Sequence, residues 1–323
     1  MRVLVTGGAG YIGAHTSRLL ADRGDYVLVV DDLVTGSTSR IPELPVVKLN
    51  IANGSAQQLE ELMREHHIDA VIHFAAQKQV GQSVEKPAWY YEQNVGSVAQ
   101  LLLAMEAAGV HKLIFSSSAA VYGEASGLIA EDAPTQPINP YGATKLVSEQ
   151  LVSAAAHAWP LQAASLRYFN VGGAGEPALG DTQALNLIPI CFEQLAAGES
   201  PVIFGDDYDT PDGTCVRDYV HVSDVAEAHL AVLDALPAAP GNAVLNIGTG
   251  IGTSVREMVD AIIRVSGSSR SARIAGRRSG DPAAVVGRVE NIFELTGWRA
   301  RYSVEDIVDS AWQSRRYFEQ RAD

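Results

Sequence analysis

Three glycines near the start of the chain constrain its fold more than any other feature. Gly7, Gly10 and Gly13 are spaced three apart in VTGGAGYIG and directly follow the apolar run RVLVT at 2–6. Glycines at this spacing permit a tight turn from a strand into a helix, and they let backbone amides approach a pyrophosphate at the helix N-terminus. Such a turn can also be purely structural, so its context decides the interpretation.

That context favours a dinucleotide site. A second apolar run at 26–30 leads into Asp31, where an acid can accept hydrogen bonds from an adenosine ribose. Asp32 follows, and no arginine stands beside this pair to receive a 2′-phosphate. We therefore expect NAD rather than NADP.

Apolar runs alternate with helical patterns through the first half of the chain. The runs lie at 2–6, 26–30, 45–49, 69–74, 112–117 and 163–168, and helix-like stretches lie near 11–23, 55–66, 88–109 and 141–158. This alternation predicts parallel strands covered on both faces, in a doubly wound α/β, Rossmann-type sheet. Beyond about residue 175 we expect a strand at 202–204 and helices near 185–198, 223–236, 254–266 and 304–318.

The regular alternation of apolar runs and helical patterns ends near residue 175, which predicts two domains. We expect an NAD-binding domain over 1–175 and a smaller α/β substrate domain over 176–323, with some later segments returning to the first domain.

Charge and composition exclude several kinds of partner. The formal net charge of −14 disfavours nucleic acid and anionic membranes. No apolar stretch reaches the roughly 18–20 residues of a membrane span, and MRVLVTGG does not resemble a signal peptide. Two cysteines predict a reducing compartment, and the histidines lack zinc-ligand spacing. We expect a cytoplasmic protein that binds no nucleic acid, membrane or metal.

Tyr141 and Lys145 in YGATK are four residues apart at the start of an expected helix. This spacing places both side chains on one face, where an ammonium would favour phenolate and lower the pKa of the tyrosine. A phenol so tuned can act as a base near neutral pH. An isolated pair of this kind is more often an exposed helix face. Here Ser118 and the dinucleotide pattern precede it, which favours catalysis.

These features resemble the extended short-chain dehydrogenase/reductase superfamily. Within it, the chain is similar to the UDP-glucose 4-epimerases from residue 2 to beyond residue 280, through the segments VTGGAGYIGAHT, VIHFAA, SSSAAVYG, NPYGATK, LRYFNVGGA, GTCVRDYVHV and NIGTG.

The resemblance implies reversible interconversion of UDP-galactose and UDP-glucose. Tyr141 would take the proton of the sugar 4-hydroxyl while hydride passes from carbon 4 to a permanently bound NAD. The 4-keto sugar would turn over and receive the hydride on its other face. Ser118 would relay the proton, and Lys145 would bind the nicotinamide ribose and hold Tyr141 ionised. In this family the helices expected at 88–109 and 141–158 pair in a homodimer.

The resemblance also assigns binding residues. The cofactor would be held by Gly7, Gly10, Tyr11, Ile12, Gly13, Asp31, Asp32, Leu33, Val34, Thr35, Gly36, Asn50, Ile51, Phe74, Ala75, Ala76, Gln77, Lys78, Asn94, Tyr141, Lys145 and Phe169. The UDP-sugar would be held by Ser118, Tyr141, Asn170, Asn186, Leu187, Phe204, Arg217, Arg278, Asp281 and Val285. The forked guanidinium of arginine suits a diphosphate.

Several positions depart from the family pattern. Asn50 replaces the usual aspartate, although its amide oxygen can still accept a hydrogen bond from adenine. Ala120 replaces a threonine, and Arg288 stands where aspartate is commoner. The resemblance places Val285 at the position that sets sugar size in this family, and its moderate volume predicts some turnover of UDP-N-acetylglucosamine.

Three alternatives remain open. A UDP-N-acetylglucosamine 4-epimerase, or another nucleotide-sugar 4-epimerase, would use the same residues. A 4,6-dehydratase or decarboxylase is disfavoured, because dehydratases typically carry a carboxylate just before Val-Tyr-Gly, where this chain has Ala119 and Ala120. A non-catalytic NAD-sensing regulator would tolerate loss of Tyr141 or Lys145, and both are present.

Overall fold

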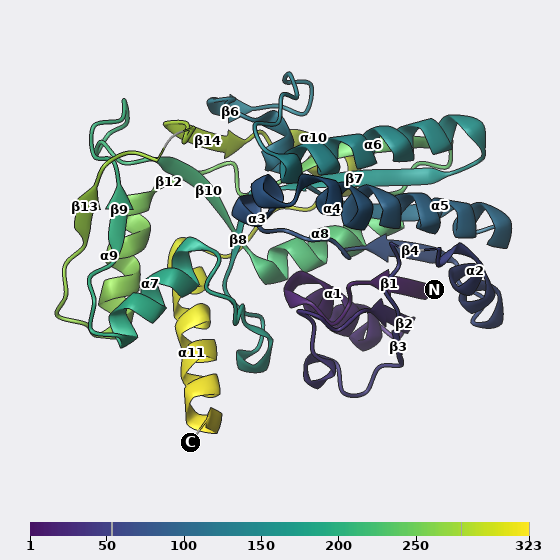
Figure 1. Cartoon of the computed structure of the whole chain (residues 1–323), viewed down its shortest axis with the longest axis horizontal. Helices are drawn as coiled ribbons and strands as arrows, with labels where there is room; N and C mark the ends of the chain where they lie inside the picture. The colour runs from purple at the N-terminus through teal and green to yellow at the C-terminus, as the bar shows by residue number, and fades with distance from the viewer. Residues whose placement is uncertain (53, 279, 323) are drawn as a thin grey trace.

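The computed structural model describes residues 1–52, 54–278 and 280–322, and its larger part is a seven-stranded parallel sheet (Figure 1). The strand order is β11-β7-β5-β4-β1-β2-β3. The strands are β1 (Arg2–Thr6), β2 (Tyr26–Asp31), β3 (Val46–Lys48), β4 (Ala70–His73), β5 (Lys112–Ser118), β7 (Gln162–Tyr168) and β11 (Gly241–Ile247). This confirms the doubly wound α/β class. The order reverses beside β1, where open α/β sheets bind ligands at the carboxyl ends of their strands.

Alternate residues of the strands enter two separate cores, one on each face of the sheet. Val3 and Val5 face the core covered by α1 (Tyr11–Asp22), α8 (Val222–Ala235) and α10 (Glu290–Thr296). Leu4 faces the core covered by α2 (Ala56–Glu65), α5 (Gly96–Ala108) and α6 (Pro140–Ala158). Burial on both sides explains why these strands are unbroken apolar runs.

A second body lies beside the carboxyl ends of the large sheet (Figure 1). Its sheet has the order β12-β10-β14-β6, with β8 paired to β10, and β9 pairs with β13. These strands are β6 (Gly127–Ile129), β8 (Asn170–Gly172), β9 (Val202–Phe204), β10 (Val216–His221), β12 (Gly252–Ser254), β13 (Arg273–Ala275) and β14 (Ala284–Gly287). The helices α7 (Leu187–Ala196), α9 (Val255–Ser266) and α11 (Val304–Ala322) share its core.

The chain crosses between the two bodies more than once. β11 and α8 follow residue 176 yet belong with the large sheet, whereas β6 precedes residue 175 yet pairs with β14. The division at residue 175 stays a proposal, and these exchanges refine it.

The helix expected at 88–109 is interrupted. Its parts are α4 (Pro87–Tyr90), a π-helical segment at Tyr91–Val95 and α5, and the short helix α3 (Val80–Glu85) precedes them. Helix ends carry recognisable signals elsewhere: Asn139 caps α6 by accepting from the Gly142 amide, and Ser254 and Glu257 form a capping box on α9. Within the described ranges, no helix is long and apolar enough to cross a membrane.

Candidate active site

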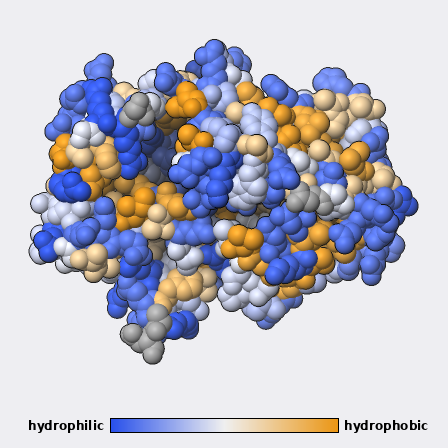
Figure 2. All heavy atoms as spheres, in the orientation of Figure 1, coloured by the Kyte–Doolittle hydropathy of each residue, from blue (hydrophilic) through white to orange (hydrophobic). Residues whose placement is uncertain are grey.

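A cleft of about 770 Å³ lies at the carboxyl ends of β1, β2, β4, β5 and β7. Figure 2 shows the hollow between the two bodies. It brings together residues from distant parts of the sequence. Those that the sequence predicted are Gly7, Gly10, Tyr11, Ile12, Gly13, Asp31, Asp32, Thr35, Asn50, Ile51, Phe74, Ala75, Ala76, Gln77, Lys78, Ser118, Tyr141, Lys145, Phe169, Asn170, Asn186 and Leu187.

The glycine turn leaves the N-terminus of α1 open to this cleft. Gly7 has φ +70°, and a Cβ there would lie 2.6 Å from the Ala75 amide nitrogen. A Cβ on Gly13 would lie 2.2 Å from the Gly7 carbonyl oxygen. The residue capping α1 is Gly10, and the first turn holds no acidic residue. The unpaired amides and the helix dipole therefore suit an anion such as a pyrophosphate.

Asp31 fixes the loop that would meet the adenosine ribose. Its carboxylate accepts hydrogen bonds from the Ala9 amide at 3.0 Å and the Leu33 amide at 2.9 Å. Burial raises the pKa of this carboxyl, while those two hydrogen bonds lower it. Leu33 adopts φ +60° and packs on the core of the sheet, and Val34 is exposed. Neither side chain lines the cleft.

The remaining predicted cofactor residues also support the wall. Asn50 accepts from the Ala52 amide at 2.9 Å, which uses one lone pair of its amide oxygen. Gly36 lies against the Asp31 carboxylate, where a Cβ would be 2.8 Å from Oδ1. Asn94 is buried outside the lining and pairs with both backbone groups of Gln77, so it holds the loop after β4.

The three predicted catalytic residues meet at the end of β5. Ser118 is the last residue of β5, and its Oγ accepts from the Ala120 amide at 3.1 Å. Tyr141 shares a hydrogen bond with Ser118. Lys145 is one turn further along α6, and its Nζ donates to the Ser116 carbonyl at 2.8 Å.

The expectation that Lys145 lowers the pKa of Tyr141 is wrong for this structure. Burial raises the pKa of Tyr141, and its hydrogen bond with Ser118 only partly lowers it. Burial also lowers the pKa of Lys145 to about 8, while the Glu149 carboxylate raises it. The ammonium does not depress the phenol pKa here, because loss of water dominates and Lys145 is bound to a backbone carbonyl.

A second cavity of about 290 Å³ joins the first at Asn170 and Leu187. Its wall includes the predicted residues Phe204, Arg217, Arg278 and Asp281. The Arg217 Nη1 donates to the Val216 and Pro282 carbonyls, and its Nη2 lies 3.7 Å from Asp281.

Two further groups shape this second cavity. The Arg278 guanidinium carbon lies 3.9 Å from the centroid of the Phe204 ring. Asn186 precedes α7 at the N-cap position, but its side chain donates to Asp181 at 3.0 Å and makes no capping hydrogen bond. The first residue of α7, Leu187, lines both cavities. These arginines and the helix end suit a diphosphate.

Val285 lies outside both linings. It is partly buried against Val121, Tyr122 and Phe169, and its strand neighbours are Arg217 and Gly127. It therefore packs behind the part of the cleft wall that Phe169 forms. Among the described residues, no group of three or more His, Cys, Asp or Glu side chains is arranged to hold a metal.

Comparison with known proteins gives the family. Residues 3–248 match the model of the NAD dependent epimerase/dehydratase family. The chain is 46% identical to the UDP-glucose 4-epimerase of Azospirillum brasilense, over 99% of this chain and 93% of that one. The chain belongs to the NAD dependent epimerase/dehydratase family.

Solved structures of family members share the whole fold. One is a UDP-glucose 4-epimerase from Stenotrophomonas maltophila with bound NAD and formylated UDP-arabinopyranose (TM-score 0.94, 40% identity, 99% of both chains). Another is the UDP-Glc/GlcNAc 4-epimerase of Campylobacter jejuni (TM-score 0.87, 37% identity, 98% of this chain and 99% of that one).

The structure adds wall residues of this family member that the sequence did not indicate. Arg40 lines the large cleft from a short 3₁₀ helix at Thr38–Arg40, and Asp181 lies near it in a loop. Tyr219 contributes to both cavities, and Arg315 reaches the cleft from α11. Tyr219 lies within the segment GTCVRDYVHV, although the sequence assigned it no role. The other three lie outside the segments that carry the resemblance, and only the tertiary fold brings them to the site.

Proposed function

We propose that this chain is a UDP-glucose 4-epimerase, which interconverts UDP-galactose and UDP-glucose with bound NAD. The observation that carries the proposal is the meeting of Ser118, Tyr141 and Lys145 between a glycine turn and an arginine-bearing cavity. The named relatives and the NAD in the Stenotrophomonas maltophila structure support it. The glycine turn fits a dinucleotide, because side chains at Gly7 and Gly13 would collide with the backbone.

In the proposed reaction, Tyr141 and Ser118 handle the proton while NAD handles the hydride. Bound NAD supplies a reversible hydride acceptor for sugar carbon 4 and, when oxidised, a positive charge in the cleft. Tyr141 removes the proton of the 4-hydroxyl and later returns a proton to the oxygen of the 4-keto sugar. Ser118 shares the proton through its hydrogen bond with Tyr141. This role requires the tyrosine pKa to fall once the cofactor is bound, since burial alone raises it.

The UDP part is held while the sugar turns. Arg217 and Arg278 supply two cations in the smaller cavity, and the N-terminus of α7 adds its dipole. Because this anchor is separate from Ser118 and Tyr141, the 4-keto sugar can rotate while the diphosphate stays bound. Lys145 binds the nicotinamide ribose in this proposal.

A coupled dehydrogenase assay tests the reaction. Purified protein should convert UDP-galactose to UDP-glucose, and Tyr141→Phe should reduce kcat by about 10²- to 10⁴-fold, the usual contribution of a general acid–base group. Circular dichroism and NAD content should remain those of the wild type. No conversion by NAD-loaded wild-type protein would refute the proposed activity, and a near-normal Tyr141→Phe rate would refute the assignment of the base.

A second activity, 4-epimerisation of UDP-N-acetylglucosamine, is favoured by Val285. This side chain is smaller than an aromatic ring and supports the cleft next to Phe169, and the related Campylobacter jejuni enzyme is a UDP-Glc/GlcNAc 4-epimerase. A panel of UDP-sugars checks this. Turnover of UDP-galactose with none of the N-acetylated sugar would remove the second activity and leave the first.

The proposal includes a cytoplasmic homodimer. Both cysteines are unpaired and buried, as expected in a reducing compartment. Trp89, Tyr91 and Leu103 are exposed along the helical segments before and within α5, where pairing with a second copy would cover them. Light scattering of the purified protein measures the oligomeric state directly.

A further inference from the structure

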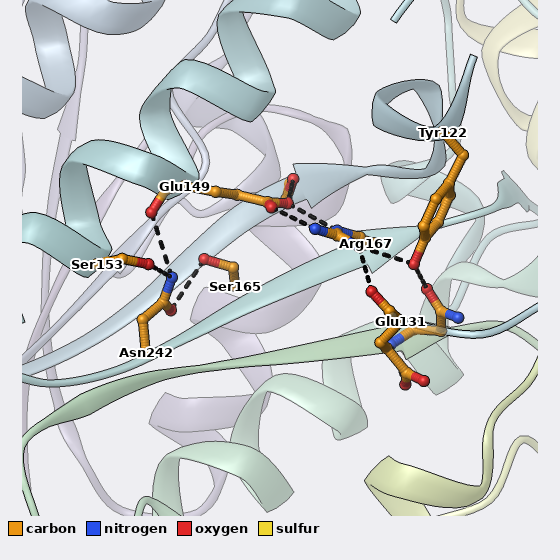
Figure 3. A network of polar contacts seen from close by, with 9 residues as sticks. Tyr122, Glu131, Glu149, Ser153, Ser165, Arg167 and Asn242 are labelled. Atoms are coloured by element: carbon orange, nitrogen blue, oxygen red, sulfur yellow. Dashed lines mark hydrogen bonds and ion pairs between the residues drawn. The ribbon is translucent and has the colours of Figure 1, made fainter. Parts of the chain in front are cut away.

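One buried polar network links β5 and α6, the two elements that carry the candidate catalytic groups, to β7 (Figure 3). Its centre is Glu149 on α6, one turn beyond Lys145. The Glu149 carboxylate accepts hydrogen bonds from the Ser117 hydroxyl on β5 and from Arg167 on β7, whose Nε and Nη2 lie at 2.9 and 2.6 Å. The side chains of Arg167 and Glu149 are only 6% and 5% exposed, so the ion pair is closed to water.

The network reaches both sides of Ser118. Ser117 precedes it, and Tyr122 ends the 3₁₀ turn at Ala119–Tyr122 that follows it. Arg167 Nη1 donates to the Tyr122 hydroxyl at 2.9 Å, and that hydroxyl donates to Asn246 at 2.7 Å. The positions of β5, the turn after Ser118, α6 and β7 are therefore coupled through one ion pair.

Glu149 also acts on Lys145, which lies one helical turn before it on α6. Lys145 is buried, and its ammonium donates to a neutral carbonyl and lies 5.2 Å from the Phe115 ring centroid. Glu149 is the carboxylate that acts on it: burial lowers the lysine pKa to about 8, and Glu149 opposes this fall. The titratable and charged groups around Lys145 are Tyr141 and Glu149 on α6, His73 on β4, and Arg167 and Tyr168 on β7.

We propose that Glu149 is a positioning residue for this reaction, which keeps buried Lys145 charged and holds α6 in place against β5 and β7. The inference rests on the proposed function, because the consequence for turnover requires Lys145 to act as a cation beside the cofactor. Stability alone does not explain the ion pair, since well-packed apolar residues commonly replace a buried pair at little cost. Because Glu149 lies one turn from Lys145, its negative charge can favour the charged form of that lysine.

Glu149→Gln tests the proposal through the pH dependence of turnover. Loss of the carboxylate leaves Arg167 unpaired, and both changes disfavour the Lys145 ammonium. We expect kcat to fall more than KM changes, and its alkaline limb to move to lower pH. The ratio of the rate at pH 8 to the rate at pH 6.5 should fall by about fourfold, the change expected when a pKa of about 8 falls by one unit.

A matched control separates charge from packing. Asn242 donates to Ser153 Oγ at 3.0 Å and lies against the Glu149 carbonyl, so Asn242→Ala removes neutral contacts from the same part of α6. We expect its pH profile to match the wild type. If Asn242→Ala shifts the alkaline limb as far as Glu149→Gln does, the role assigned to the Glu149 charge is wrong.

A double variant keeps the proposal testable if Glu149→Gln alone fails to fold. Removing one partner of a buried ion pair leaves an uncompensated charge in the interior, which strongly destabilises a fold. Glu149→Gln combined with Arg167→Met removes both charges and keeps the interior neutral. This variant lacks the unpaired arginine that disfavours the ammonium in Glu149→Gln, so its alkaline shift should be smaller than that of the single variant. A shift should still be present, because Glu149 is the partner that raises the Lys145 pKa. A wild-type profile in the double variant would overturn the proposal.

The titration of Lys145 provides a readout that does not depend on turnover. The chain has five lysines, so a spectrum of protein labelled with [¹³C]lysine can resolve the Lys145 Cε signal in the NAD-loaded protein. The signal should titrate at lower pH in Glu149→Gln. An unchanged titration rejects the inference about Glu149, whereas an inactive wild type rejects the proposed function, so the two failures are distinguishable.

Discussion

Gly13 shows at the scale of one residue why the glycine turn tolerates no side chain. A Cβ there would lie 2.2 Å from the Gly7 carbonyl oxygen, which is backbone and cannot rotate away. We expect Gly13→Ala to lower the free energy of unfolding by about 2 kcal/mol or more, at the upper end of overpacking costs. It should also reduce the NAD that copurifies with the protein, since the turn must open to relieve the contact.

A second glycine offers the control for this prediction. Gly81 in α3 has ordinary helical backbone, and its added Cβ would meet nothing within 4 Å. Gly81→Ala should therefore leave stability unchanged or raise it by up to about 1 kcal/mol, as alanine favours a helix over glycine. Equal NAD content in the two variants, measured by absorbance after denaturation, would contradict the steric argument for Gly13.

At the scale of elements, Arg40 joins the short helix after β2 to a loop of the second body. Its Nη2 donates to the Gly180 carbonyl at 3.0 Å and to Thr182 Oγ1 at 3.3 Å, and its side chain lines the cofactor cleft. Arg40→Met should weaken this connection and speed NAD release, with little effect on kcat at saturating NAD. Gel filtration followed by NAD quantification measures the retention.

The matched variant for Arg40 is Thr182→Val. It removes the longer of the two hydrogen bonds and keeps the cation in the cleft. We expect intermediate or unchanged retention of NAD. If Thr182→Val loses as much NAD as Arg40→Met, the hydrogen bond rather than the charge of Arg40 retains the cofactor.

The elements also show what the sequence could predict. Apolar runs buried on two faces produced a clear pattern, so the strands of the large sheet up to β7 were predicted to within a few residues. β8, β10, β12 and β14 were not predicted, because short strands in a small mixed sheet carry little periodic signal. The π-helical segment at Tyr91–Val95 also lacks a sequence signal, yet it directs Asn94 toward the Gln77 loop.

The candidate site was predictable to the extent that its residues lie in motifs. Ser118, Tyr141 and Lys145 were found through short spacings next to a strand or at a helix start. The pKa of Tyr141 was not predictable, since it depends on burial and on the carbonyl that binds Lys145. Arg40 reaches the cleft through a contact across 140 residues of sequence, which no local pattern indicates.

At the scale of the whole molecule, four buried histidines couple stability to pH. Burial lowers the pKa of His15, His221 and His229 to about 4 and that of His73 to about 3. They stay neutral in the folded chain but bind protons near pH 6.5 once unfolded. The unfolded state therefore gains protons first, and stability falls as the pH drops below about 6.5.

Buried carboxyls with a raised pKa, such as Asp218, act in the opposite direction, since the folded state protonates them first. A histidine variant separates the two effects. Between pH 6.5 and 5 each buried histidine should remove up to about 2 kcal/mol of stability. In His73→Asn the free energy of unfolding, measured with urea, should therefore fall less steeply with decreasing pH than in the wild type. Exposed His157 provides the control, and His157→Asn should retain the wild-type slope. Equal slopes for all three proteins would show that burial of neutral His73 does not drive acid instability.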